Sequence, residues 1–279
     1  MTPPGTTIDC DLSGIALRVR GLDEPLVREF AATWGPFLVQ APAAPWLTVD
    51  VAPAAHALPG GRTMRAAFTS EVEAGRARFA IDEGEIEIPE EGPATARLAR
   101  GNDRWRFWGL ANLLGAALAF RLPARPAALV HAAGIVVAGR AFLLAGPPGS
   151  GKSTWARLAR EAGERVVGDD TVLVDGAGGA LELLGSPIRA HEAAPLSRGR
   201  WPVAAILLPK WGAPARLSPA RRIDVEARLA ASLPYVAAGF GRDARLDGLV
   251  PRLAPLTAHG TLTFAPDPSF LEALRSFRS

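Results

Sequence analysis

The sequence is poor in several residue types, and each shortage narrows the classes of protein that it can encode. Its 279 residues include a single cysteine, Cys10. One cysteine excludes an internal disulfide framework and any zinc site built from several thiolates. Lysine is almost absent: of 31 basic residues only Lys152 and Lys210 are lysines, as a coding bias towards arginine would produce. A position that keeps lysine in such a chain is expected to need a compact ammonium rather than a planar guanidinium.

Long apolar runs and secretory features are also lacking. The longest apolar stretch, 110–120, contains Asn112 and Gly115 and is too short to cross a bilayer, but it is typical of a buried helix. The opening MTPPGTTIDCDL has neither the basic nor the apolar region of a signal peptide. The sequence therefore predicts a cytoplasmic protein with no membrane partner.

Charge is present in ordinary amount but is unevenly distributed. Hydrophobic residues make up 48% and charged residues 21%, as in globular proteins, and the net charge is +3. Residues 1–95 carry a net charge of −7 and residues 96–279 one of +10. The basic part suits anionic ligands such as phosphates, although an arginine-rich surface would give the same balance. No block of like charges is typical of a nucleic-acid-binding arm, so no nucleic acid partner is expected.

The first 95 residues predict a small α+β domain. Alternating apolar residues indicate strands at 15–19 and 47–51, and an Asp-Glu-Pro start indicates a helix over 23–33. A hairpin is expected over 77–88. The Pro- and Gly-containing stretch 89–102 is the predicted linker.

Residues 96–279 predict an α/β domain in which apolar strands alternate with helices. Trp105 and Trp108 are interpreted as core residues of its first helix. The expected helices are 103–121, 152–162, 224–238 and 268–277, and the expected strands are 128–137 (as one or two strands), 141–145, 165–167, 171–174, 203–208 and 260–264.

A glycine-rich loop is the most specific motif in the chain. GPPGSGKS, from Gly146 to Ser153, matches the phosphate-loop pattern G-x-x-x-x-G-K-[ST], between a predicted strand and a predicted helix. Backbone N–H groups and the helix start bind phosphate oxygens, while Lys152 reaches the β- and γ-phosphates and Ser153 holds Mg²⁺. The predicted nucleotide-binding residues are Gly146, Pro147, Pro148, Gly149, Ser150, Gly151, Lys152, Ser153 and Thr154.

Two adjacent carboxylates follow this loop closely. Asp169 and Asp170 end the predicted strand at 165–167 and lie only 17 residues beyond Lys152. One helix and one turn fill that interval, so this strand is expected beside the loop strand, with both acids at the carboxyl edge of the sheet. One acid can hold metal-bound water while the other accepts a proton. The alternative is a solvated Gly-Asp-Asp turn.

Histidine and the second lysine give weaker signals. His131 lies 21 residues before Lys152 at a predicted strand end and by itself is more typical of a structural histidine. Lys210 follows a predicted strand and is either a second phosphate contact or a solvated residue. The other histidines have no ligand spacing, so a metal-only hydrolase has no support.

The segment from His131 to Asp170 resembles the catalytic domain of the HPr serine kinase/phosphorylase family. The resemblance rests on HAAGI at 131–135, GPPGSGKST at 146–154 and ERVVGDD at 164–170, and on their mutual spacing. The short interval between the phosphate loop and the acidic pair is its most specific element. The chain resembles most the divergent HPr-kinase-related proteins found with peptide-modification systems, including lasso peptide kinases.

The resemblance implies roles for individual residues. Asp169 would be the general base that takes the serine proton, and Asp170 would help hold Mg²⁺. His131 would lie beside the site of phosphoryl transfer. Glu192 is a weak match to a further metal-binding glutamate, and Arg221-Arg222 is a loose match to the arginine-glycine segment of the family.

The predicted function is an ATP- and Mg²⁺-dependent kinase that acts on a serine of a protein or peptide. The fold expected from the resemblance is a P-loop domain of the HPr-kinase type, preceded by an accessory or substrate-recruiting α+β domain. Family enzymes form oligomers, so the resemblance implies a homo-oligomer. Two alternatives stay open: a small-molecule kinase, for example of free serine, and a nucleotide-binding regulatory protein that transfers no phosphate.

Overall fold

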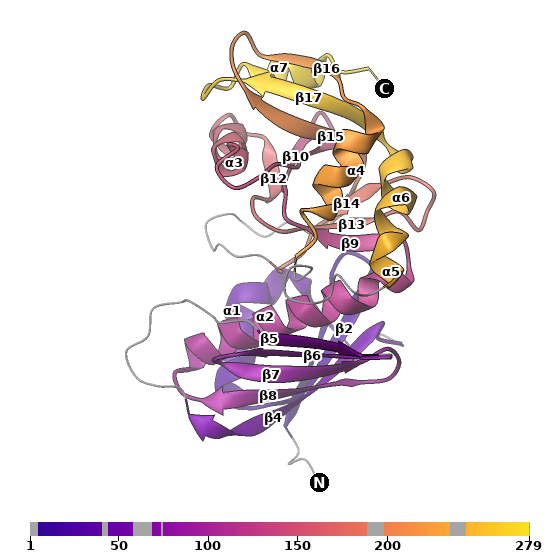
Figure 1. The fold of residues 1–279 in the computed structure, drawn as a ribbon. Helices are drawn as coiled ribbons and strands as arrows, with labels where there is room; N and C mark the ends of the chain where they lie inside the picture. Colours follow the sequence, from indigo (N-terminus) through magenta and orange to yellow (C-terminus); the bar gives the residue numbers. More distant parts are fainter. Residues whose placement is uncertain are drawn as a thin grey trace. The chain divides into compact units, whose positions relative to one another are not determined.

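The protein has a mixed α/β fold. The computed structural model describes residues 5–40, 44–57, 69–73, 75–188, 198–234 and 244–278. Backbone contacts divide these residues into two compact units (Figure 1). Unit 1 comprises the described residues up to Arg121, and unit 2 those from Leu122 onwards.

Unit 1 is a sheet with helices on one face. Its order is β3-β1-β2-β4-β8-β7-β6-β5, in which β4 is parallel to β2 and β8 and the other pairs are antiparallel. The elements are β1 (Thr6–Asp11), β2 (Ala16–Leu22), α1 (Glu24–Trp34), β3 (Leu38–Val39), β4 (Leu47–Ala57), β5 (Thr69–Glu73), β6 (Arg76–Ile81), β7 (Gly84–Pro89), β8 (Ala94–Arg100) and α2 (Asp103–Arg121), with a 3-10 turn at Gly35–Phe37.

The sequence explains the two sides of this sheet. In β6, Phe79 and its alternate neighbours are buried while Arg76 and Arg78 are exposed, which is the period of a strand with one covered face. Aromatic rings of the helices cover that face. Phe30 of α1 contacts Trp34 of the same helix and Phe107 of α2 edge to face, with ring centroids 5.0 Å apart in each pair.

Two predictions about the N-terminal region differ from the structure. The linker prediction is wrong over 94–100, because this segment is β8, which pairs with β4 and β7. Its alternate residues Ala94, Ala96 and Leu98 are buried, so burial of a face overrides the nearby prolines and glycine. The compact unit ends at Arg121 rather than at residue 95, because α2 packs on β7 and β8.

Helix α2 is also the one described helix long and apolar enough to cross a membrane by composition alone. Within Asp103–Ala124, 72% of its most apolar window is buried. Phe107, Leu110 and Leu114 contribute to that burial. The helix therefore has the burial of a core helix, as the sequence predicts for 110–120.

Unit 2 is built around a sheet that contains the phosphate-loop strand. Its order is β12-β10-β11-β15-β17-β16, and β14, β13 and β9 continue from the first residues of β15. The strands are β9 (Ala127–Val130), β10 (Ala133–Val137), β11 (Arg140–Leu144), β12 (Arg165–Gly168), β13 (Val172–Asp175), β14 (Glu182–Leu184), β15 (Arg200–Trp211), β16 (Arg216–Pro219) and β17 (Ala258–Phe264). The helices are α3 (Lys152–Glu161), α4 (Arg222–Ala230), α5 (Ala244–Asp247), α6 (Leu249–Leu253) and α7 (Phe270–Arg275), with 3-10 turns at Leu122–Ala124 and Ala254–Leu256.

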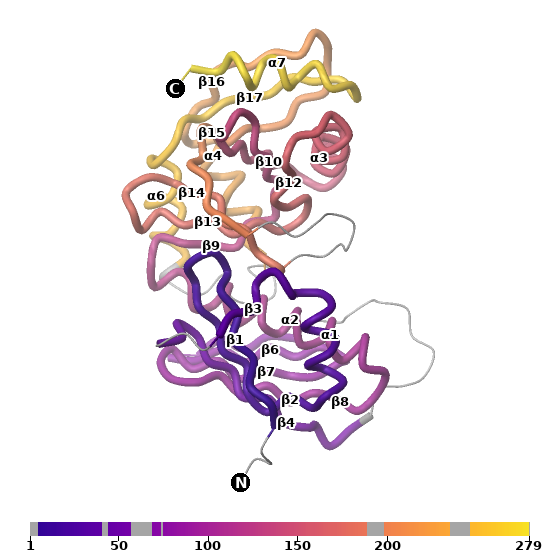
Figure 2. Tube along the Cα trace, turned by 180° about the vertical axis from the view of Figure 1, so that it is seen from behind, coloured from indigo at the N-terminus to yellow at the C-terminus, as the bar shows by residue number. Residues whose placement is uncertain are grey.

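Strand β11 is buried on both faces. Phe142 and Leu144 belong to a core with α3 and α7, and both figures place α3 beside β10 and β12 (Figure 2). Ala141 and Leu143 belong to a second core with β13, α4 and α6. A continuous apolar strand with helices over it is typical of α/β proteins. The carboxyl end of β11 is therefore held firmly where the glycine-rich loop begins.

The strand order differs in one respect from the prediction. Strand β12 does not pair with β11, because β10 lies between them and pairs antiparallel with both. β10 and β11 form a tight hairpin through Ala138 and Gly139, so the nearest position beside β11 is already filled. Two antiparallel pairings in succession leave β12 parallel to β11. The two strands therefore still end at the same edge of the sheet.

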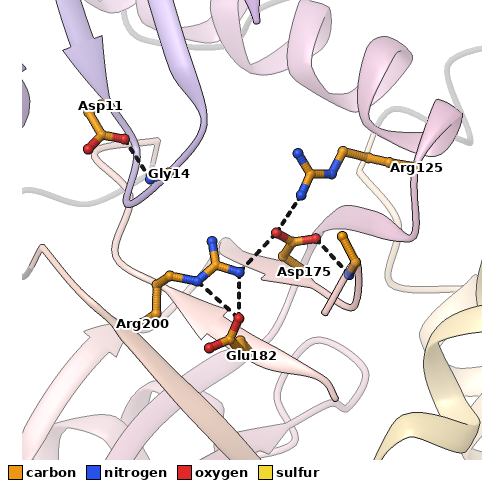
Figure 3. Close-up of polar contacts among 7 residues, drawn as sticks. Asp11, Gly14, Arg125, Asp175, Glu182 and Arg200 are labelled. Atoms are coloured by element: carbon orange, nitrogen blue, oxygen red, sulfur yellow. Dashed lines mark hydrogen bonds and ion pairs between the residues drawn. The ribbon is translucent and has the colours of Figure 1, made fainter. Parts of the chain in front are cut away.

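A buried carboxylate stabilises the other part of unit 2. Asp175, only 1% exposed, accepts hydrogen bonds from Arg125 at 2.6 Å, Arg200 at 3.0 Å and the Ala177 N–H at 3.1 Å (Figure 3). Arg200 also binds Glu182 on the neighbouring strand. Burial alone would raise the pKa of Asp175, but the Ala177 hydrogen bond and the two guanidinium groups hold it below its usual value. Because both cations bind this one buried acid, we interpret the cluster as structural.

Candidate functional site

The strand register brings the predicted site residues to one edge of the sheet. Leu144, the last residue of β11, lies opposite Ala133, near the start of the antiparallel strand β10. Gly134 lies opposite Gly168, the last residue of β12. His131 precedes this edge and Asp169 follows it, as does the glycine-rich loop. The edge is therefore the candidate site.

The loop has the backbone geometry of an anion-binding turn. Gly149 and Gly151 have φ angles of +75° and +96°, which residues with a side chain rarely adopt. Gly151 caps α3 with no side-chain hydrogen bond, which leaves the first N–H groups of the helix available. The buried Ser150 hydroxyl has no hydrogen-bond partner in the part of the chain that the structure describes. An unsatisfied buried hydroxyl beside free N–H groups fits a phosphate ligand.

Lys152 is buried inside this loop. Its Nζ donates to the carbonyl oxygens of Gly146 at 2.9 Å and Pro147 at 3.1 Å, and the residue is 6% exposed. An ammonium has three donors, so one remains for a ligand. Burial is the main cause that lowers the pKa of Lys152; Asp170 opposes it and Arg228 adds to it.

Asp170 and His131 are in contact at the sheet edge. His131 Nδ1 lies 3.3 Å from Asp170 Oδ1, and the Thr171 hydroxyl donates to Asp170 Oδ2 at 3.1 Å. The effect of Asp170 on Lys152 places this carboxylate within electrostatic range of the phosphate loop. The structure thus brings together residues from three segments that the sequence singled out separately.

Asp169 differs from Asp170 in its surroundings. Among the described residues, no hydrogen bond or ion pair engages the Asp169 carboxylate, which is half-buried. An unengaged carboxylate can accept a proton from an incoming hydroxyl group. In the described part of the chain, Asp170 is therefore the acid held by His131 and Thr171, whereas Asp169 is the acid that can accept a proton.

Arg228 is a site residue that sequence reasoning missed. It is half-buried on α4, and no carboxylate in the described ranges pairs with it. One helical turn further on, the carbonyl of Ser232 accepts the backbone N–H of His131 at 2.6 Å, which ties this end of α4 to the site. Because Arg228 adds to the lowering of the Lys152 pKa, the two cations lie within electrostatic range of each other, with Asp170 as the opposing charge. That arrangement favours a multiply charged anion.

No sequence signal would have separated Arg228 from the other arginines. The chain has 31 basic residues, nearly all of them arginine. Arg221 and Arg222, the loose match to a family segment, are exposed and pair with Asp224 and Glu226 on the surface of α4. Arg228 is distinguished from them by its half-buried position on α4 and by its electrostatic effect on Lys152.

The metal-ligand prediction is covered only in part by the structure. Ser153 lies in the first turn of α3, next to Lys152, and Asp170 is near that lysine. Hydroxyl and carboxylate oxygens are the donors that Mg²⁺ prefers, so these two residues fit the ion. Glu192 lies outside the described residues. Within the described ranges, no group of three or more His, Cys, Asp or Glu residues could hold a metal ion.

Thr154 follows Ser153 in the first turn of α3. Lys210 is an exposed residue near the end of β15. Nothing in the described part of the chain binds the Lys210 ammonium. Its position fits the solvated residue better than a second phosphate contact.

Comparison with known proteins gives distant similarity to solved structures and no match at the level of sequence families. No family model matches the sequence, and no curated protein matches it. Among solved structures, the chain is similar to the Hpr(Ser) kinase/phosphatase from Coxiella burnetii at 10% identity and a TM-score of 0.29. That match covers 53% of this chain and 93% of the other.

Proposed function

We propose that the protein is an ATP- and Mg²⁺-dependent kinase that transfers the γ-phosphate to a serine hydroxyl of a protein or peptide. The observation that carries the proposal is the unengaged carboxylate of Asp169 at the same sheet edge as the phosphate loop. A phosphate site alone would serve binding. A free carboxylate beside it adds the group that a transferase needs for its nucleophile.

The chain's cations bind the triphosphate. The loop N–H groups and the start of α3 hold its oxygens, and the third donor of Lys152 reaches the β- and γ-phosphates. The guanidinium of Arg228 contacts the transferring phosphoryl group, whose charge is spread over its outer oxygens. Ser153 and Asp170 would hold a magnesium ion, which would supply charge neutralisation at the β- and γ-phosphates.

Asp169 and His131 have separate tasks in the transfer. Asp169 accepts the serine proton while the serine oxygen forms its bond to the γ-phosphorus and the bond from that phosphorus to the bridging oxygen breaks, leaving ADP. His131 positions the Asp170 carboxylate through their contact at 3.3 Å. Most of the rate enhancement then comes from positioning and charge neutralisation.

A peptide or protein acceptor follows from the resemblance of 131–170 to the HPr kinase family, and the test must identify that acceptor. The purified chain is incubated with ATP, Mg²⁺ and serine-bearing products of neighbouring genes, and a one-phosphate mass shift is measured. Free serine is a parallel acceptor. Lys152→Ala is expected to lose ATP binding and the mass shift together.

Three outcomes separate the alternatives. A shift on a serine-bearing polypeptide supports the proposal. A shift only on free serine makes the protein a small-molecule kinase. Tight ATP binding with no shift on any acceptor contradicts transfer and favours a nucleotide-binding regulatory protein.

A further inference from the structure

Trp211 is a large apolar side chain that lies exposed at the candidate site. It is the last residue of β15 and is 48% exposed, whereas its neighbour Phe264, the last residue of β17, is fully buried. Single exposed apolar residues are common on protein surfaces and need no ligand to explain them. Trp211 is distinguished by its position, because it lies against the phosphate loop.

Aromatic packing and the loop backbone hold the indole in place. Its ring centroid is 4.9 Å from that of Phe264, with 30° between the planes, and Phe264 packs against Phe270 at 6.1 Å. The indole also lies against Gly151: a methyl group at this glycine would come within 2.7 Å of Trp211 Cζ2. The exposed indole of Trp211 therefore packs on the buried rings of Phe264 and, behind it, Phe270.

The order of the strands places this ring on the opposite side of the loop from the acids. Strand β11 lies between β10 and β15; β12, which leads to Asp169, is beyond β10, and β17 is beyond β15. A triphosphate whose γ-phosphate points towards Asp169 extends its α-phosphate towards the ends of β15 and β17. Trp211 and Phe264 are the residues at those ends.

We propose that Trp211 stacks on the base of the phosphoryl donor, and that this donor is a purine nucleoside triphosphate rather than an inorganic polyphosphate. The inference rests on the proposed function, since it takes the loop as the triphosphate site. Stacking uses the π-face that every base has, so it tolerates different bases. ATP and GTP therefore bind with similar affinity, and a pyrimidine nucleotide, with its smaller ring, binds more weakly.

The test compares two ligands that share the phosphates and differ in the base. Calorimetry gives the Kd of ATP and of inorganic tripolyphosphate, both with Mg²⁺, for the wild type and for Trp211→Ala. We expect the Kd of ATP to rise about tenfold or more in the variant, while that of tripolyphosphate stays within about twofold. Trp211→Phe, which keeps an aromatic face, is expected to recover most of the ATP affinity. Trp105→Ala, at a 36% exposed tryptophan of α2, is the matched control and is expected to change neither value.

The outcomes distinguish the two proposals. Equal weakening of both ligands by Trp211→Ala means that the indole only supports Gly151, and unchanged binding of both means that the base lies elsewhere; either result overturns the stacking role alone. If Trp211→Phe melts like the wild type and yet binds ATP as weakly as Trp211→Ala, stacking is also overturned. A wild-type protein that binds neither ligand overturns the proposed function together with this inference.

Discussion

Charged residues are arranged differently in the sheet of unit 1 and at the edge of the sheet in unit 2. On the exposed face of unit 1, arginines pair with acids on neighbouring strands, as Arg20 does with Asp50 and Arg78 with Glu85. At the unit 2 edge, Arg228 acts electrostatically on Lys152, and the Asp169 carboxylate is unengaged in the described part of the chain. Exposed pairs contribute only about 0–1 kcal/mol each. Like charges left close together disfavour folding, so their retention indicates a ligand.

The candidate site is thus identified by charged side chains without ion-pair partners in the described part of the chain, and not by the number of charges. The surface of unit 1 has a groove of about 270 Å³ lined by acids and arginines, but nearly all of them are joined in ion pairs. The buried Asp175 cluster of unit 2 is paired in the same way. In the described part of the chain, the edge beside the phosphate loop combines the buried Lys152 with half-buried charged side chains, of which Asp169 and Arg228 have no ion-pair partner.

The largest effect is expected from the unengaged carboxylate. Asp169→Asn removes the proton acceptor while keeping the shape, so phosphoryl transfer should fall by about 10²- to 10⁴-fold while the Kd of ATP stays near that of the wild type. Single-turnover transfer and calorimetry measure the two quantities. Glu85→Gln, which changes a paired carboxylate of unit 1, is the control and should leave transfer unchanged. Normal transfer by Asp169→Asn would show that the base is assigned wrongly.

The paired buried carboxylate should affect stability instead. Asp175→Ala leaves Arg125 and Arg200 without their shared buried partner, so it should lower the free energy of unfolding of unit 2 by about 3–5 kcal/mol. Asp50→Ala removes an exposed partner of Arg20 and should lower stability by no more than about 1 kcal/mol. Urea titration with hydrogen exchange resolved by segment measures each unit. Equal losses for the two variants would contradict the distinction between buried and exposed pairs.

Arg228 provides the next test, with a control on the same helix. Arg228→Ala should slow transfer by about 10²-fold, because it removes a cation from the transferring phosphoryl group. Arg222→Ala lies on the solvent side of α4, where it loses only an i,i+4 pair with Glu226, and it should change transfer little. The kcat and KM values for ATP, with melting temperatures, separate a charge contact from a packing effect. A slowed Arg222→Ala, or an Arg228→Ala with unchanged kcat, would contradict the proposed contact.

Sequence reasoning predicted the elements whose signals are local. The helix over 103–121 matches α2, and the helix from Lys152 matches the start of α3, because an apolar period and a glycine-rich start are read within a few residues. The linker prediction failed because the prolines and glycine of 89–93, which are typical of loops, lie just before β8, whereas β8 itself contains neither residue type. Its strand state depends on β4, some 40 residues earlier in the chain.

The common sheet edge of the phosphate loop and the acid pair was predicted, but the order of the strands that form it was not. The phosphate-loop pattern singled out Lys152, and the short interval after it singled out Asp169 and Asp170. Strand β10 lies between β11 and β12, and this strand order depends on tertiary packing that no local sequence pattern predicts. Arg228 and Trp211 come from segments more than 50 residues after the loop, and only the packing of α4 and β15 brings them to it.

Low pH should reduce the stability that the paired carboxylates contribute in both units, and this loss of unfolding free energy should be smaller than the loss caused by the substitutions. The folded pKa of Asp175 lies below its usual value, so its contribution to stability is present above the ordinary pKa of about 4 and is lost as the pH falls through the folded pKa. The pKa of Glu85 is lowered too, mainly by its hydrogen bond from Arg78. Urea titrations at pH 7 and pH 3 should therefore show a smaller pH-dependent loss for Asp175→Asn than for the wild type. An identical loss would show that Asp175 is not held ionised by its partners.

Substitution of Lys210 is expected to give the smallest effect, in contrast to substitution of Lys152. Lys152 and Lys210 both lack a carboxylate within ion-pair distance in the described ranges, but only Lys152 is buried and bound to loop carbonyls. An exposed ammonium is hydrated and needs no ligand, so its lack of a partner indicates nothing. Lys210→Ala should change the Kd of ATP by less than about twofold, measured beside Lys152→Ala, which should abolish binding. A marked loss of ATP affinity in Lys210→Ala would show that an exposed lysine also contacts the phosphates. In that case β15 would supply a second phosphate contact.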